Sequence, residues 1–180
     1  MMRYLQRYPH FLEVVYDGML KVIRPFRRWL TPESWLNRPF TWLERVSKEA
    51  LFDCRMCGQC ILHSTGMTCS MTCPKNLRNG PCGGVRQNGH CEVKPEMRCV
   101  WVQVYERSLQ MPDYGFEMLN LQPPVNRQLE GTSSWINMLH GIDKKLPDGW
   151  VNTEDIAIVL NADEAEHQTL WTQNLKQAVG

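Results

Sequence analysis

The chain has 180 residues, of which 43% are hydrophobic and 22% are charged, and its formal net charge is +1. This composition is typical of a folded globular protein and excludes collagen-like or broadly disordered chains. The length suits one domain with extensions. It excludes a complete β/α-barrel enzyme, which needs about 250 residues.

Charge is spread unevenly along the chain. Residues 1–60 carry ten Lys and Arg against six Asp and Glu, residues 61–110 carry six against three, and residues 111–180 carry four against ten. The basic excess is smaller than that of a nucleic-acid-binding domain, so we expect no nucleic-acid partner. We also expect no transmembrane segment, because no run approaches the ~18 apolar residues of a membrane helix. The start of the chain has no secretory signal, which predicts a cytoplasmic protein.

Three helices are predicted before the first cysteine. Apolar residues recur at helical spacing over residues 11–23, and Pro25 ends or kinks that helix. Thr31 is the expected cap of a second, short helix, which residues 37–39 break. A third helix is expected over residues 39–51. Three tryptophans lie among the arginines of this arm, and we interpret them as anchors that pack the helices onto the cysteine region or a partner subunit: Trp29, Trp35 and Trp42. The alternative is a membrane-surface or nucleic-acid face.

Turn signals dominate the next region. Asn88-Gly89 predicts a short hairpin that presents Cys91, and residues 100–109 fit a helical stripe, although their valines also permit a strand. The tail is expected to be extended, with a short helix over 132–139, an apolar run at 156–160 and a final helix over 161–179. We therefore divide the chain into a helical arm (1–52), an eight-cysteine cluster-binding domain (53–110) and a partner-docking tail (111–180).

All eight cysteines lie between Cys54 and Cys99. The first three are separated by two residues each, so a single short loop offers three sulfurs. This spacing is typical of the loop that holds three irons of a cubane cluster, with the fourth sulfur arriving from farther along the chain. In a reducing cytosol, metal ligation is a commoner use of cysteine than a disulfide. The candidate metal ligands and cofactor-binding residues are Cys54, Cys57, Cys60, Cys69, Cys73, Cys82, Cys91 and Cys99.

Eight thiolates divide evenly into two sites of four ligands. The spacing of the first three favours two [4Fe–4S] clusters, and two zinc ions are the alternative, since structural zinc also takes four thiolates. His63 and His90 could replace a thiolate, but with eight cysteines available we interpret them as supporting or surface groups. No motif for catalysis or nucleotide binding accompanies the cysteines, so this chain alone is not expected to be catalytic.

Several short motifs in the cysteine region are together highly specific. They are Cys57–Cys60, Thr68–Lys75, Asn79–Val85, Gly89–Val93, Cys99–Trp101 and Tyr105–Arg107. Through these motifs the chain resembles the methylenetetrahydrofolate reductase C-terminal domain family, the small cysteine-rich companion subunit of bacterial methylenetetrahydrofolate reductases. The resemblance covers residues 50–110 firmly, and residues 129–135 look like a further family segment.

The resemblance implies that a separate β/α-barrel subunit holds FAD and the folate, and that this chain binds to it. Clusters beside a flavin suggest a one-electron relay from a ferredoxin-like donor to FAD. We therefore expect a non-catalytic electron-transfer subunit of a hetero-oligomeric reductase in one-carbon metabolism. The alternative function is a zinc-binding adaptor that stabilises the catalytic subunit without redox work.

The expected fold is a small α+β fold with a loop-rich cysteine core that binds two metal clusters. A helical N-terminal arm and an extended C-terminal tail flank this core. Because the apolar core is expected to be small, metal ligation should contribute much of the folding free energy.

Overall fold

The computed structural model describes residues 2–146 and 149, with side chains from residue 5 onward. The chain divides into two compact units, residues 1–145 and 146–180, and every element named below belongs to the first. Two predicted features of the tail, the apolar run at 156–160 and the final helix at 161–179, lie outside the described residues. The three-part division of the chain stays a prediction.

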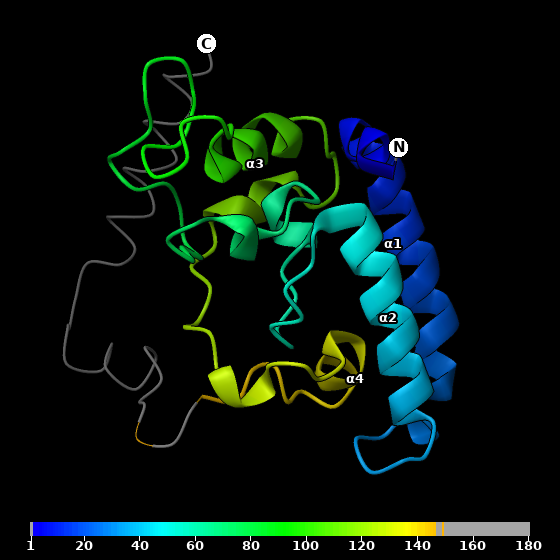
Figure 1. Ribbon diagram of the computed structural model, residues 1–180. Coiled ribbons are helices and arrows are strands. Elements are labelled where there is room, and N and C mark those ends of the chain that lie inside the picture. Colours follow the sequence, from blue (N-terminus) through cyan, green and yellow to red (C-terminus); the bar gives the residue numbers. More distant parts are fainter. Residues whose placement is uncertain (1, 147–148, 150–180) are drawn as a thin grey trace, which may run out of the picture. The chain divides into compact units, whose positions relative to one another are not determined.

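The described part of the chain is helix-rich. Its α-helices are α1 (Pro9–Ile23), α2 (Asn37–Phe52), α3 (Val100–Ser108) and α4 (Ser134–Leu139). Its short 3-10 helices are η1 (Met2–Arg7), η2 (Arg24–Arg28), η3 (His63–Thr65), η4 (Ser70–Thr72), η5 (Gly115–Leu119) and η6 (Arg127–Leu129). Figure 1 shows α1 and α2 running in opposite directions along one side of the molecule.

The helical arm is built as two long helices. Helix α1 confirms the predicted first helix, and Pro25 follows its end within η2. The predicted short helix after Thr31 is wrong, because residues 32–36 form turns. The third predicted helix, over residues 39–51, is confirmed as α2, which begins at Asn37, where the break was expected. Pro39 lies in the first turn of α2, where its missing N–H leaves no helical hydrogen bond unmade.

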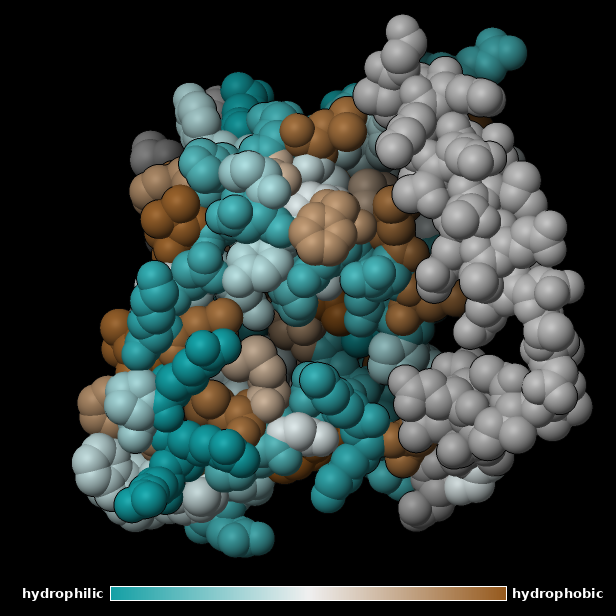
Figure 2. All heavy atoms as spheres, turned by 180° about the vertical axis from the view of Figure 1, so that it is seen from behind, coloured by the Kyte–Doolittle hydropathy of each residue, from teal (hydrophilic) through white to brown (hydrophobic). Residues whose placement is uncertain are grey.

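The three tryptophans of the arm do not pack onto the cysteine region. Their exposed fractions are 63% for Trp29, 81% for Trp35 and 65% for Trp42. The interpretation as anchors to the cysteine region is therefore wrong. Other hydrophobic side chains of the arm are exposed as well, and Figure 2 shows brown hydrophobic surface along the margin where α1 and α2 lie.

The cysteine region is made of loops and turns. Within residues 2–146 it contains two isolated antiparallel β-bridges, Val85 with Cys91 and His90 with Arg98, and no longer strand. The expected α+β class is therefore not confirmed. The predicted hairpin is confirmed at its turn, where Gly89 has a φ of +77° and the His90 carbonyl accepts a 2.9 Å hydrogen bond from Arg86 N–H. Each bridge joins one residue pair because turns and cysteines interrupt the run on both sides.

The remaining helices follow the sequence closely. Helix α3 confirms the helical stripe at residues 100–109 and excludes the strand alternative. Helix α4 confirms the short helix of the tail, and the side chain of Ser133 accepts the N–H of Ile136 at 3.2 Å as its N-cap. Between them, residues 121–126 have no regular structure, as the prolines of this segment predict.

Three small apolar clusters hold these elements together. The first joins α1 to the cysteine region through Leu12, Leu62, Met67 and Met111. The second joins α1, α2 and α4 through Ile23, Leu30, Trp135 and Ile136, and the third packs α3 against the second half of the cysteine region. The cysteine loops therefore lie between elements that are anchored to one another. Among the described residues, no helix is both long enough and apolar enough to span a membrane.

Candidate metal centre

The fold separates the eight cysteines into two sets of four. One cavity, the first cysteine cavity, is lined by Cys54, Cys57, Cys60 and Cys69. Another, the second cysteine cavity, is lined by Cys73, Cys82, Cys91 and Cys99. All eight thiols are free of disulfides. The sequence spacing alone left this partition open.

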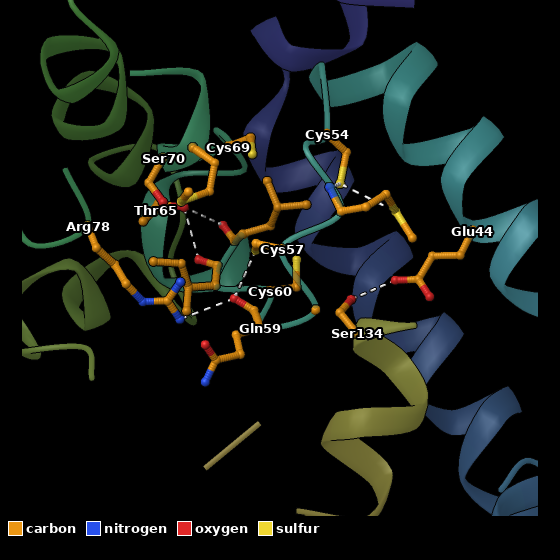
Figure 3. A pocket seen from close by; sticks show the side chains of 15 residues that line it. Glu44, Cys54, Cys57, Gln59, Cys60, Thr65, Cys69, Ser70, Arg78 and Ser134 are labelled. Carbon is orange, nitrogen blue, oxygen red and sulfur yellow. Dashed lines mark hydrogen bonds between the residues drawn. The ribbon is translucent and has the colours of Figure 1, made fainter. Parts of the chain in front are cut away.

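A tight loop after α2 builds most of the first cavity. Asp53, Met56 and Gly58 all have positive φ values of 52°, 49° and 73°, so the backbone reverses repeatedly between residues 53 and 58. Figure 3 shows the resulting arrangement, with Cys54, Cys57 and Cys60 presented from this loop and Cys69 from the segment before η4. Gly58 is required here, since a Cβ at this position would collide with the backbone carbonyl of Leu129.

The thiols of the first cavity are buried, and burial determines their protonation. Loss of solvent around the thiol raises the pKa of Cys54 to about 12 and that of Cys69 to about 11, and it also raises the pKa of Cys57. These groups are therefore neutral near pH 7 in the free protein. A bound metal ion supplies the positive charge that stabilises the thiolate form.

A buried arginine lies at the wall of the same cavity. Arg78 is only 8% exposed, and one of its nitrogens donates a 3.1 Å hydrogen bond to the carbonyl of Gln59. Its Nε and Nη1 have no hydrogen-bond partner within the described part of the protein. Burial lowers the pKa of Arg78, and the nearby Cys57 and Cys60 oppose that shift. The carboxylate of Asp143 lies near enough to interact with this cation: burial raises the pKa of Asp143, and Arg78 opposes that rise. A metal group held by four thiolates would be a second anion that fits this position.

A second polar group supports the cavity from the arm. Lys48 donates hydrogen bonds of 2.7 Å to both the carboxylate of Glu44 and the hydroxyl of Ser134. The hydroxyls of Ser133 and Ser134 in turn donate to Glu44. Burial alone would lower the pKa of Lys48, but Cys60 and Glu44 raise it overall. Glu44 and Ser134 line the cavity, so this network fixes α4 to α2 directly beside the cysteines.

The second cavity is assembled from cysteines that stand singly in the sequence. Cys73 comes from a bend after η4, Cys82 from an irregular segment, Cys91 from the hairpin, and Cys99 is the residue before α3. Trp101 lines this cavity and also a pocket beside η5, and its indole Nε1–H is buried with no hydrogen-bond acceptor within the described part of the protein. A sulfur in the cavity would supply that acceptor. Each cavity is therefore lined by four cysteines and by one residue whose buried donor lacks a partner.

Comparison with known protein families shows the family to which the chain belongs. A family model described as "Methylene-tetrahydrofolate reductase C terminal" matches residues 34–128. The chain belongs to this family. No curated protein and no solved structure matches the chain.

The family match includes the residues of both cavities. Residues 34–128 contain all eight cysteines, Arg78 and Trp101, and also Glu44 and Lys48 of the supporting network. Helix α1 and the serines at the start of α4 lie outside the match. The resemblance stated from the cysteine motifs is thus confirmed at the level of the family.

Among residues 2–146 and 149, no three or more His, Cys, Asp or Glu side chains lie close enough together to hold a single ion. The two candidate histidines line neither cysteine cavity. His63 stacks on Tyr16 with ring centres 5.3 Å apart, and His90 lies 2.7 Å from the carbonyl of Pro95.

Sequence reasoning missed the polar residues that support the cavities. Arg78, Glu44, Lys48 and Trp101 were not predicted as site residues. Glu44 and Lys48 carry a signal that could have been recognised, because opposite charges four residues apart face each other on a helix. Arg78 carries no such signal, since only the folded chain brings it to Cys57.

Proposed function

We propose that this chain is the electron-transfer component of a methylenetetrahydrofolate reductase, with two [4Fe–4S] clusters that relay electrons to the FAD of a separate β/α-barrel subunit. The observation that carries the proposal is the division of eight cysteines into two cavities of four. Family membership supplies the link to methylenetetrahydrofolate reductase. When bound, such clusters supply one-electron transfer.

The cavities support clusters over single zinc ions. Four thiolates around one zinc ion lie about 2.3 Å from the metal and leave no room between them. In a cubane each thiolate binds a different iron, so the four cysteines need only line one cavity and need not converge on one point, as is the case in the described part of the chain. Within the proposal, the cysteines are the ligands, and Arg78 and Trp101 donate hydrogen bonds toward the sulfurs of the first and second cavity.

An open cleft gives the first cavity a route to a partner. Gln59, Cys60 and Ile61 line both the first cysteine cavity and a larger cleft at the protein surface. The second cavity has its own exposed edge, where Lys75 and Glu92 form an ion pair beside Cys82. Electron transfer slows steeply with distance, so a partner group in the cleft would exchange electrons most readily at Cys60.

The zinc-binding adaptor remains the second candidate, because sets of four thiols suit structural zinc as well. Cys57→Ala separates the two functions. In an electron relay, the variant abolishes ferredoxin-linked turnover of the reassembled reductase, while the FAD subunit keeps its activity with an artificial donor. In an adaptor, the variant releases or destabilises the catalytic subunit in every assay. Full ferredoxin-linked activity of Cys57→Ala would contradict the relay.

A further inference from the structure

A cleft of about 840 Å³ opens beside the first cysteine cavity. This volume lies within the range of about 300–1,000 Å³ that is typical of sites for small molecules and cofactors. Cys60 and Arg78 line both the cleft and the first cavity, and Figure 3 shows Arg78 reaching toward the carbonyl of Gln59, next to Cys60. We refer to this space as the Cys60 cleft. A ligand in it lies against a wall that it shares with the first set of cysteines.

Aromatic rings form one wall of the Cys60 cleft. Tyr16, His63 and Tyr114 all line it. The rings of Tyr16 and His63 stack with their centres 5.3 Å apart, and Tyr114 meets them edge-on at 5.9 Å and 5.7 Å. Leu20 and Met138 add apolar surface to the same cleft. A wall of this kind suits a flat, largely apolar ring system.

Two arginines of the cleft are suited to a phosphate group. Arg24 and Arg27 line the cleft and belong to η2, a 3-10 helix, in which residues three apart lie on the same side. Both are exposed, and none of the salt bridges found in the described residues involves them. Guanidinium groups bind phosphate through charge-assisted hydrogen bonds that are often bidentate.

The charge of the lining indicates the charge of the ligand. The cleft is lined by four cationic side chains, which are the two arginines of η2, Arg78 and Lys144, and by two carboxylates, Glu117 and Asp143. Burial lowers the pKa of His63, so its ring is neutral near pH 7. Four cations against two anions leave a surplus of two positive charges. A ligand that carries about two negative charges complements this lining.

The neighbouring cysteines restrict the chemistry of the ring. An iron–sulfur cluster exchanges one electron at a time, so a ligand that exchanges electrons with it at Cys60 has to accept them singly. Flavins do so, whereas nicotinamides transfer hydride. Flavin mononucleotide and FAD both join a flat ring to phosphate that carries about two negative charges near pH 7. A flavin nucleotide therefore matches the aromatic wall, the arginines and the position beside Cys60.

We propose that the Cys60 cleft is a binding site for a flavin nucleotide, with its ring against the aromatic wall and its phosphate held by Arg24 and Arg27. The choice of a redox-active ring rests on the proposed function, because it requires a cluster at Cys60. Two electrons that the cluster delivers one at a time, with two protons from water, reduce the bound ring, and each transfer returns the cluster to its oxidised state. The nucleotide is flavin mononucleotide held by this chain or the FAD of the catalytic subunit, which share the chemistry that the cleft recognises.

The test measures the binding of flavin mononucleotide, FAD and riboflavin to the full chain, purified without oxygen, by equilibrium dialysis. Riboflavin has the same ring but no phosphate. We expect at least one nucleotide to bind about 100-fold more tightly than riboflavin, because each of the two arginine–phosphate contacts contributes about tenfold. Tighter binding of flavin mononucleotide assigns the cleft to a nucleotide of this chain, and tighter binding of FAD assigns it to the cofactor of the catalytic subunit.

Replacing the arginines one at a time tests the phosphate contact. Arg24→Gln and Arg27→Gln should each weaken the binding of the nucleotide by about tenfold and leave the binding of riboflavin unchanged. Arg28→Gln is the matched control, because Arg28 belongs to the same 3-10 helix and is exposed but does not line the cleft. It should bind all three flavins as the unchanged chain does.

A larger side chain in the cleft tests the position of the ring. Gln122 lines the cleft, and its hydrogen bonds with Asn79 use its backbone, so Gln122→Trp fills the cleft and leaves these bonds in place. The variant should weaken the binding of all three flavins alike. Gln128→Trp alters an exposed side chain outside the cleft and should change nothing. Thermal melting and metal content should be the same in all five variants, which shows that a loss of binding is not a loss of folding.

The outcomes separate the flavin site from the relay on which it rests. If neither nucleotide binds, or if Arg27→Gln and Arg28→Gln bind alike, the site is overturned, while a chain that holds two clusters still supports the relay. Tighter binding of NADH or of 5-methyltetrahydrofolate than of either flavin nucleotide would also overturn the site. If the nucleotides bind as expected to a chain that holds zinc and no iron, the flavin site stands and the relay falls.

Discussion

The two cysteine cavities hold equal numbers of thiols but are built in different ways. The first takes three of its cysteines from one tight loop and is supported by the buried network of Glu44, Lys48 and Ser134. The second takes each cysteine from a separate segment of the chain, and its neighbouring ion pair of Lys75 and Glu92 is exposed. Local sequence therefore supplies three of the four thiols of the first cavity, whereas the fold as a whole assembles the second.

The two cavities also differ in the buried hydrogen-bond donor that accompanies each of them. Arg78 brings a full positive charge to the first cavity, whereas Trp101 brings a neutral N–H to the second. Charge acts over a longer distance and more strongly than a single neutral hydrogen bond. Two groups of identical composition would therefore differ in reduction potential because of the protein around them.

The largest effect is expected from removing one ligand of each set. Cys57→Ser should abolish the first cluster and Cys91→Ser the second, so each variant should retain about half of the iron and sulfide. The double variant should retain neither. Iron and sulfide analysis measures this directly. Loss of all metal in either single variant would show that the cavities do not act as separate sites.

Breaking the support of the first cavity should be the next largest effect. Glu44→Gln leaves the buried Lys48 without its carboxylate, and we expect it to lower the free energy of unfolding by about 3–5 kcal/mol. Glu49→Gln on the exposed side of α2 is the matched control and should change it by less than about 0.5 kcal/mol. Urea unfolding under anaerobic conditions measures both. Equal effects would mean that the network does not support the fold.

The contrast between the donors predicts a difference in redox behaviour. Arg78→Gln should make the first cluster harder to reduce. At a given potential, the ratio of reduced to oxidised cluster should fall by about tenfold or more, and each tenfold change in this ratio corresponds to a shift of ~59 mV in reduction potential. Trp101→Phe should shift the second cluster in the same direction by less. Redox titration followed by EPR gives both values.

Arg78→Lys is the matched control for charge. It keeps the positive charge but loses the planar set of donors, so its potential should lie between those of Arg78→Gln and the unchanged chain. A potential equal to that of Arg78→Gln would mean that donor geometry and not charge sets the shift.

The smallest expected effect compares one glycine from each cavity. Gly58→Ala combines a positive φ with a clash against the Leu129 carbonyl, and should cost about 1–3 kcal/mol. Gly84→Ala meets only the carboxylate end of Glu92, which can move, and should cost less. Gly83→Ala meets nothing and is the neutral control. Urea unfolding ranks the three variants by their free energy of unfolding. A greater loss of this free energy for Gly84→Ala than for Gly58→Ala would contradict the expected order.

Much of the helical structure could be predicted from local pattern. Helices α1, α3 and α4 follow apolar spacing and capping residues, as with Ser133 ahead of α4. The helix predicted over residues 39–51 corresponds to α2, which begins two residues earlier, since proline is tolerated in the first turn of a helix. The strand content was overestimated, because the hairpin at Gly89 forms single bridges only.

The site was predictable in composition but not in arrangement. Spacing pointed to Cys54, Cys57 and Cys60 as one group, but nothing local assigns Cys69 to that group and Cys73 to the other. That division depends on a turn around η4, which directs neighbouring cysteines to different cavities. Arg78 and Trp101 become functional candidates only once their burial and missing partners are known.

One measurement tests the central claim most directly: iron, zinc and acid-labile sulfide per chain in protein purified without oxygen, with an EPR spectrum after reduction by dithionite. Two clusters predict about eight irons and eight sulfides and a signal that appears on reduction. About two zinc ions, no sulfide and no EPR signal would contradict the account. The chain would then be an adaptor, and electrons would reach the FAD by another route.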